Sequence, residues 1–335
     1  MRPLSWLAVL LLLLTLIGCG GGGTSSGSSP VPTPGPTPVP TPPPAPPPTP
    51  PPAPPPAPGT TIPTVDHFAI VVLENTSYSD VVGSASMPYL NGLIAQGGLA
   101  TNYFADAHPS IPNYFILTTG TPVTLDDSFS GVVDTDNVVR QLTAAGKTWK
   151  SYAENIPAPG SLSGDRFPYL RRHNPFSFLS DVQKSPTLST ELVPFTQFAT
   201  DLAAGTLPNY IYIAPNAIDD AHSCPDGTAN CPLSTRLGAA DQWLSTNIAP
   251  LLSNPAFSQS GILVITFDEA EDNDFTNGGG HVATVLVGSH VRPGFQGTAT
   301  YDHRSLLGLS MTALSTPIPN DAVAGSATQM TEFFQ

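Results

Sequence analysis

The sequence is poor in positive charge, in cysteine and in apolar runs of membrane-spanning length. Lys and Arg together number 11 against 25 Asp and Glu, so the net charge is −14. This balance argues against nucleic acid as a partner, and a phosphate-like anion would need a local cation to bind. The apolar run at residues 7–17 is too short for a bilayer span, which needs about 20 residues.

The cysteines number only three. Cys224 and Cys231 bracket PDGTAN, a turn-rich loop, and an exported protein permits a disulfide between them. A zinc site is the alternative, but two cysteines without a nearby second pair are a weak zinc signal.

The N-terminus has the order of a secretory signal. Arg2 is the basic residue, residues 7–17 are the apolar core, and the signal is predicted to end at residue 18. Leu16-Ile17-Gly18-Cys19 resembles the lipobox of bacterial lipoproteins, which implies cleavage before Cys19 and its acylation. We therefore expect an exported bacterial lipoprotein anchored to a membrane, on the outer membrane or at the cell surface or periplasm; secretion without lipid is the alternative.

Residues 19–63 are rich in Gly and Ser, and then in Pro, Thr and Ala. This composition cannot build a packed core and indicates a flexible start followed by a polyproline II spacer. Its PxxP patterns would also suit peptide-binding modules, but a spacer explains the segment more simply. The folded part is predicted to be a single domain at residues 64–335.

Apolar runs and helical patterns alternate along this domain. The expected fold is α/β, with a mostly parallel central sheet and helices on both faces. Strands are predicted at residues 65–73, 148–153, 210–214, 262–267 and 282–287, and helices at 87–97, 136–145, 237–252 and 305–314.

Two of the predicted strands end in oxygen-bearing pairs. Residues 262–267 are followed by Asp268 and Glu269, and the apolar run at 68–73 is followed by Glu74 and Asn75. Ligands of open α/β sheets bind just outside the carboxyl ends of the strands. Oxygen ligands of this kind suit a hard divalent cation, and a solvated strand end is the alternative.

Ser110 precedes Ile111-Pro112 at the predicted start of a helix. Ser110 is expected either to cap the helix or to act as a nucleophile whose hydroxyl proton is lost to a metal or a base. A helix N-terminus also suits a bound phosphate. Four histidines, at His108, His173, His222 and His281, lie in polar or glycine-rich stretches and are further candidates.

The motifs VVLENTSYSD, HPSIPNY, RRHNPF, DDAH, ITFDE and GGGHVATVLVG occur in this order. Together they resemble the phosphoesterase family of bacterial and fungal acid phosphatases and bacterial phospholipases C, within the alkaline-phosphatase superfamily. The resemblance covers nearly all of residues 65–314 and implies an alkaline-phosphatase-like fold.

The resemblance also implies roles for individual residues. The divalent metal would be held by Glu74, Asn75, Ser110, Asp268 and Glu269, with Ser110 as the nucleophile. His222 would lie near the phosphoryl group, as a proton donor to the leaving oxygen or a hydrogen-bond donor to a phosphoryl oxygen. Asn113, His173 and His281 would bind substrate or shape the site, and His108 is a weaker candidate.

The expected function is hydrolysis of phosphomonoesters through a phosphoserine intermediate. A phospholipase C that cleaves phosphodiester headgroups is the alternative within the family. A non-catalytic binding module on a Pro-rich stalk is the alternative outside it, although the complete set of expected site residues speaks against that reading.

Overall fold

The computed structural model of the chain describes Gly27, Gly35 and residues 59–228 and 230–335. From Gly59 onward these residues belong to one compact unit. Gly59 N donates to Phe334 O, and Ile62 packs on the core, so packing contacts begin shortly before residue 64. Cys19 and residues 1–18 lie outside the described residues. In the described part of the chain, no helix has the length and apolarity needed to cross a bilayer.

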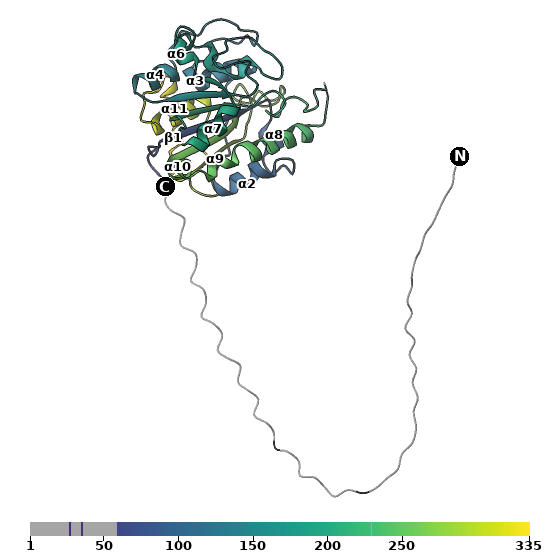
Figure 1. The fold of residues 1–335 in the computed structure, drawn as a ribbon. Helices are drawn as coiled ribbons and strands as arrows, with labels where there is room; N and C mark the ends of the chain where they lie inside the picture. Colours follow the sequence, from purple (N-terminus) through teal and green to yellow (C-terminus); the bar gives the residue numbers. More distant parts are fainter. Residues whose placement is uncertain (1–26, 28–34, 36–58, 229) are drawn as a thin grey trace, which may run out of the picture. The chain divides into compact units, whose positions relative to one another are not determined.

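An eight-stranded sheet forms the centre of this unit (Figure 1). Its strand order is β4-β3-β5-β1-β6-β7-β2-β8. The strands are β1 (His67–Leu73), β2 (Gly98–Ala100), β3 (Trp149–Ala153), β4 (Leu192–Pro194), β5 (Tyr210–Ala214), β6 (Gly261–Phe267), β7 (Thr284–Gly288) and β8 (Phe295–Gly297). β7 runs antiparallel to both of its neighbours, whereas the other neighbouring strands pair in parallel.

Helices cover both faces of the sheet. The α-helices are α1 (Tyr78–Val81), α2 (Pro88–Gln96), α3 (Ser110–Thr119), α4 (Val138–Ala144), α5 (Ser180–Gln183), α6 (Pro186–Ser189), α7 (Thr196–Ala204), α8 (Leu233–Asn247), α9 (Ala249–Ser253), α10 (Pro255–Ser260), α11 (His303–Ala313) and α12 (Asp321–Ala324). Three 3-10 turns are η1 (Arg171–His173), η2 (Pro175–Phe178) and η3 (Thr331–Phe333). α3 packs against α11, and α2 packs against α8 on the other side of the sheet (Figure 1).

The predicted fold class is confirmed: the protein is a single-domain α/β structure with a mostly parallel sheet. The strands β1 and β6 are buried along their whole apolar runs, which is why their sequences show no polar alternation. The prediction of one helix at residues 237–252 is wrong. α8 starts earlier, at Leu233, and ends at Asn247, and α9 follows it with Pro250 in its first turn.

Candidate functional site

The carboxyl ends of β1 and β6 lie side by side, because the two parallel strands pair in register. Leu73, the last residue of β1, pairs with Phe267, the last residue of β6. The residues that follow each strand, Glu74 and Asp268, therefore meet at one edge of the sheet, where α/β proteins bind ligands. Glu74 is 2% exposed and Asp268 is 0% exposed, so both carboxylates are inside the protein.

Asn75 ties the two strand ends together. Its φ of 34° lies in the left-handed region, which Asn tolerates better than most residues. This turn lets its backbone N donate to Asp268 Oδ1 at 3.0 Å and its Nδ2 donate to Glu269 Oε1 at 2.8 Å. The amide oxygen of Asn75 remains directed toward Ser110, whose Oγ lies 3.5 Å away.

Ser110 is the first residue of α3, and Pro109 occupies the N-cap position without a side-chain cap. Ser110 is therefore not the cap of α3, which was one of the two roles expected for it. Its hydroxyl donates instead to Glu269 Oε1 at 2.9 Å. Ile111 N donates to Asp127 Oδ1, and Pro112 has no N–H, so the first turn of α3 has few amides to offer an anion.

The carboxylates at this edge repel one another. Burial, together with the charges of Glu74 and Glu269, raises the pKa of Asp268 well above its ordinary value. Burial and the charge of Glu74 raise the pKa of Glu269 to about 8. Asp268 Oδ2 and Glu269 Oε2 are buried and receive no hydrogen bond. Negative charge is therefore concentrated here beyond what the protein's own donors balance.

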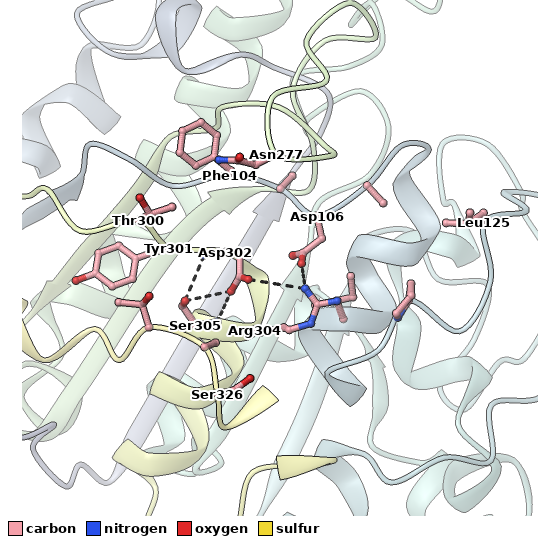
Figure 2. A pocket seen from close by; sticks show the side chains of 16 residues that line it. Phe104, Asp106, Leu125, Asn277, Thr300, Tyr301, Asp302, Arg304, Ser305 and Ser326 are labelled. Atoms are coloured by element: carbon pink, nitrogen blue, oxygen red, sulfur yellow. Dashed lines mark hydrogen bonds and ion pairs between the residues drawn. The ribbon is translucent and has the colours of Figure 1, made fainter. Parts of the chain in front are cut away.

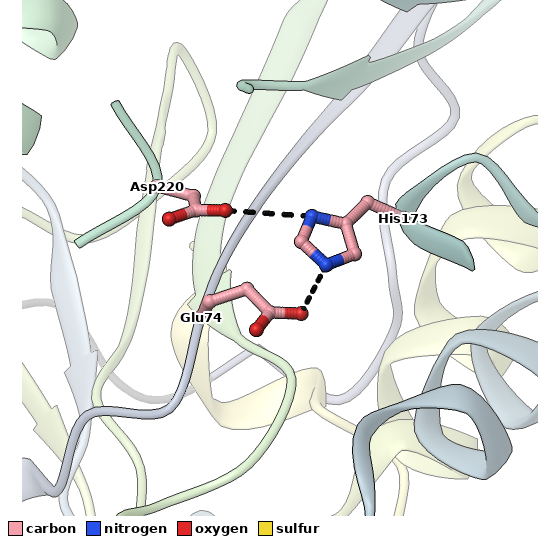
Figure 3. A group of neighbouring side chains, drawn as sticks. All are labelled: Glu74, His173 and Asp220. Atoms are coloured by element: carbon pink, nitrogen blue, oxygen red, sulfur yellow. Dashed lines mark ion pairs between the residues drawn. The ribbon is translucent and has the colours of Figure 1, made fainter. Parts of the chain in front are cut away.

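Glu74 also belongs to a second buried group, which it forms with His173 and Asp220 (Figure 3). Its Oε1 lies 2.8 Å from His173 Nε2 and accepts a hydrogen bond from Tyr114 Oη at 3.0 Å. On the other side of the ring, His173 Nδ1 lies 3.4 Å from Asp220 Oδ2. Burial disfavours charge on Glu74 and on His173, but their attraction outweighs it, lowering the pKa of Glu74 to about 2 and raising that of His173 to about 9.

His108 lies on the opposite side of Glu269. Its Nδ1 is 2.8 Å from Glu269 Oε2, and its Nε2 is 2.9 Å from the carbonyl oxygen of Asp274. A carbonyl only accepts, so Nε2 carries a proton and Nδ1 faces the carboxylate. The histidine that was the weakest sequence candidate therefore contacts one of the candidate metal ligands, Glu269.

His222 is exposed and lines the open mouth of the site. With Asn75, Arg236 and the loop at residues 271–273 it borders a cavity of about 310 Å³. Its backbone N donates to Asp220 Oδ1, which anchors the histidine beside the buried group. The position allows the imidazole to reach a substrate in the mouth.

Asn113 and His281 support the site from outside it. The side chain of Asn113 accepts from the backbone N of Asp106 and of Ala107 and donates to Ala107 O, so its amide orients the loop before Ser110. The ring of His281 stacks on Tyr78, and its Nε2 contacts Thr101 O. None of these contacts is with Ser110 or with the carboxylates.

Asp220, Tyr114 and His303 are site residues that the sequence reasoning missed. His303 is fully buried, and its Nε2 donates to Asp268 O at 2.6 Å while its Nδ1 lies 3.0 Å from Tyr103 Oη. It thereby holds the main chain of a candidate metal ligand. The DDAH motif could have indicated Asp220, but the sequence analysis assigns a role only to the histidine of this motif, His222.

Cys224 and Cys231 form a disulfide with a Cα–Cα distance of 5.8 Å, which removes the zinc alternative for this pair. The disulfide closes the loop that follows His222. The lipid attachment predicted at Cys19 lies outside the described residues.

A larger cavity, of about 590 Å³, lies elsewhere, and none of the predicted site residues lines it (Figure 2). Its one basic side chain, Arg304, is bound by the carboxylate of Asp106, lies 3.7 Å from Asp302 and donates to Gly120 O. The guanidinium is therefore committed to the protein, and the cavity has no cation left to attract an anion.

The residues at the edge of the sheet suit a divalent cation. Asp268 Oδ2 and Glu269 Oε2 are buried oxygens without donors, and a cation would satisfy both while removing the repulsion among the carboxylates. Carboxylate, amide and hydroxyl oxygens are the ligands that such an ion prefers.

Comparison with known proteins points to one family. A family model described as the Phosphoesterase family matches residues 84–310. Over 269 residues the chain is 33% identical to a Mycobacterium tuberculosis protein named phosphatidylinositol-3-phosphatase, covering 78% of this chain and 83% of that protein.

Other relatives are longer than this chain. A phosphate-repressible acid phosphatase of Penicillium chrysogenum is 30% identical over 253 residues, which cover 72% of this chain but 57% of that protein. Phospholipase C A of Mycobacterium tuberculosis is 24% identical over 235 residues, or 57% of this chain and 42% of that protein. The chain thus spans about half the length of these two relatives.

Among solved structures, a Vibrio parahaemolyticus protein in the alkaline phosphatase superfamily aligns with a TM-score of 0.52 and 13% identity. The alignment covers 76% of this chain and 68% of that chain. At this identity the likeness shows a shared fold.

Proposed function

The chain belongs to the phosphoesterase family and is a phosphoester hydrolase, and we propose that it hydrolyses phosphomonoesters with a divalent cation through a phosphoserine on Ser110. The observation that carries this proposal is the hydrogen bond from Ser110 Oγ to Glu269 Oε1, beside two further buried carboxylates. Ser110 does not cap α3, and its hydroxyl instead contacts Glu269, a carboxylate of the candidate cation site.

The cation would be held by Glu74, Asn75, Ser110, Asp268 and Glu269. When bound, it supplies positive charge that favours the alkoxide of Ser110 and offsets the charge of the phosphoryl oxygens. The chain itself positions the ligands, through the register of β1 with β6 and through the amide of Asn75.

Ser110 Oγ gives its proton to Glu269 Oε1, its hydrogen-bond acceptor, and attacks phosphorus in line with the ester oxygen, so the Oγ–P bond forms as the P–O bond to the leaving group breaks. The leaving oxygen takes a proton from His222 at the mouth of the site. Water then attacks the phosphoserine and gives a proton to His222, while the Oγ–P bond breaks and Oγ regains its proton from Glu269 as inorganic phosphate forms. Glu269 keeps the hydroxyl of Ser110 oriented between turnovers.

Phosphomonoesters are favoured over phosphodiesters by the relatives. The match to the phosphatidylinositol-3-phosphatase covers most of both chains at 33% identity, whereas the match to phospholipase C A covers 42% of that protein at 24%. A name that specifies removal of one phosphate supports a phosphatase.

The test compares hydrolysis of p-nitrophenyl phosphate and p-nitrophenyl phosphorylcholine by the chelated protein and by the protein after divalent metals are restored. Ser110→Ala should lower the metal-dependent rate on the monoester by several orders of magnitude. Ser289→Ala is the matched control, because Ser289 is exposed and follows β7 at the opposite end of β6. Faster turnover of the phosphorylcholine ester would replace the proposal with a phospholipase C.

We also propose that the protein is exported and attached to a membrane through acylated Cys19. Support comes from the signal-like residues 1–18 and the lipobox-like Leu16-Ile17-Gly18-Cys19. A radioactive fatty acid should label the wild-type protein in cells, and Cys19→Ala should remove the label and release the protein from membranes. Label that persists in the variant would refute the lipid anchor.

A further inference from the structure

His222, the proposed proton donor, is held through its main chain and not through its ring. Its side chain is exposed, and among the described residues its ring takes part in no hydrogen bond or ion pair. A proton donor works only within hydrogen-bond reach of the leaving oxygen. The placement of the His222 ring therefore depends on the groups that fix its backbone.

On the side of the buried carboxylates, Asp220 fixes this backbone. Its carbonyl oxygen accepts from Glu74 N at 2.8 Å, and its Oδ1 accepts from His222 N at 2.9 Å. Its Oδ2 faces the ring of His173 (Figure 3). Between Asp220 and His222, Ala221 has a φ of 80°, in the left-handed region that residues with a Cβ rarely adopt. Such a turn persists only where the surrounding contacts impose it.

On the other side, Arg236 reaches His222 from the first turn of α8. Its Nη1 donates to His222 O at 2.9 Å, and both residues line the cavity of about 310 Å³ at the mouth of the site. A hydrogen bond from a charged donor is stronger than one between neutral groups. The other contact of the guanidinium, from Nη2 to Glu271 Oε1, is long at 4.0 Å and partly exposed, so it contributes little.

The disulfide between Cys224 and Cys231 holds the rest of this loop. It begins two residues after His222 and ends two residues before α8. The disulfide remains when Arg236 is replaced, so the loop should keep its fold and lose only the hydrogen bond at His222 O. The effect of removing that one bond can therefore be measured.

We propose that Arg236 is a positioning residue that places the His222 imidazole against the oxygen of the leaving group. This inference rests on the proposed function, in which His222 gives that oxygen a proton. Arg236 acts through the carbonyl of His222 and does not contact substrate. Its contribution follows from geometry, because a displacement of about 1 Å can lower a rate on the order of 100-fold.

The experiment compares two esters of similar size, benzyl phosphate and p-nitrophenyl phosphate, with the full chain and restored divalent metals. Benzyl alcohol leaves only with a proton, whereas p-nitrophenolate leaves without one. Arg236→Ala should therefore lower kcat/KM for benzyl phosphate by about 100-fold and leave that for p-nitrophenyl phosphate nearly unchanged. This ratio reports the steps up to departure of the alcohol, so the later attack of water does not enter it.

Two further variants guard against a general disturbance of α8. Arg236→Lys should recover part of the lost rate on benzyl phosphate, because the ammonium can still donate to His222 O. Thr235→Ala, an exposed change in the same turn, should match the wild type on both esters.

A double variant tests whether Arg236 acts through His222. His222→Ala should cause the same selective loss on benzyl phosphate, and adding Arg236→Ala to it should lower the rate no further. An equal loss on both esters in Arg236→Ala, or a further loss in the double variant, would show that Arg236 binds substrate directly and would overturn the inference.

Ser110→Ala separates this inference from the proposed function. If Ser110→Ala abolishes turnover while Arg236→Ala slows both esters equally, the positioning role is refuted and the proposed nucleophile stands. If His222→Ala slows both esters equally, the role of His222 as proton donor falls together with this inference. If Ser110→Ala keeps the wild-type rate, the phosphoserine is refuted, and the basis of the inference with it.

Discussion

Two buried aspartates, Asp201 on α7 and Asp268 at the end of β6, meet opposite surroundings. Asp201 accepts from Lys150 Nζ at 2.6 Å, from Tyr152 Oη at 2.7 Å and from Gln197 Nε2 at 2.9 Å. Burial alone would raise the pKa of Asp201, but these partners, with Lys150 foremost, lower it.

Asp268 has no such partners. Its Oδ1 accepts only from backbone amides, its Oδ2 accepts from nothing, and burial together with the charges of Glu74 and Glu269 raises its pKa. The fold can therefore supply side-chain donors to a buried carboxylate, as it does at Asp201. It supplies none to Asp268 at the end of β6. We infer that Asp201 serves stability, whereas Asp268 serves binding of a group from outside the chain.

The largest expected effect is that of Asp268→Asn. The amide keeps an oxygen for the backbone donors but removes a ligand charge, so kcat for a phosphomonoester should fall at least about 1000-fold. The free energy of unfolding of the chelated protein should not fall, because repulsion among the carboxylates is relieved. Steady-state kinetics and urea unfolding in EDTA measure the two quantities. A marked loss of stability with retained activity would reverse the comparison.

Asp201→Asn should show the opposite pattern. Lys150 loses its partner charge in a largely buried position, so the free energy of unfolding should fall by about 3 kcal/mol. The value of kcat per folded molecule should stay unchanged, because Asp201 does not contact the site residues. Urea unfolding is the measurement, with exposed Asp226→Asn as the control. Equal stability of both variants would contradict the role given to Asp201.

Glu154 is an intermediate case that sharpens the comparison through pH. It accepts from Asn216 N and Trp243 Nε1, but burial, with the charge of Asp219, raises its pKa to about 7. Folding therefore takes up a proton between the unfolded pKa of 4.5 and about 7. The stability from the protonated group is complete below pH 4.5 and lost as pH rises to about 7.

Glu154→Gln removes this titration. Between pH 4.5 and 7, the wild type should lose about 2 kcal/mol of unfolding free energy relative to the variant, after allowance for partial solvent screening. Urea unfolding at several pH values measures the difference between the two slopes. Parallel slopes would show that Glu154 is ionised in the folded protein throughout this range.

The smallest effect on the free energy of unfolding is expected at Asp241, a buried carboxylate that accepts hydrogen bonds from the start of a helix. Its two oxygens accept from Tyr89 N and Leu90 N in the first turn of α2. Asp241→Asn keeps one acceptor and removes the charge, which should cost about 1 kcal/mol. Hydrogen exchange should quicken most in α2. A loss as large as that of Asp201→Asn would show that the charge of Asp241 interacts with the start of α2 more strongly than expected.

The central strands could be predicted from the sequence because they are buried on both faces. Uninterrupted apolar runs such as that of β6 have no other simple explanation in a chain of this kind. The strands β2, β4 and β8 have three residues each, too few for any period to emerge, and they were missed. Their pairing is decided by distant segments, such as that of β2 with β7 and β8.

The site could be predicted only where it follows a strand directly. Glu74 and Asp268 were found because each ends an apolar run. Asp220 lies six residues beyond the end of β5, and its closeness to Glu74 depends on β5 lying next to β1 in the sheet. The adjacency of β5 and β1 is set by the tertiary structure, so no local pattern shows which residue of the Asp219-Asp220 pair points inward.

All ten residues of α3 are buried, including the serine at its start. A helix enclosed on every side has no solvent-facing strip along which it can rock or slide, so Ser110 is a fixed point of the molecule. Because Ser110 does not move, the substrate must come to it, and the exposed residues at the mouth of the site must recognise the substrate. Exchange of the α3 amides with solvent should require the whole domain to open, so Ser110 should be among the last parts of the protein to lose its native environment.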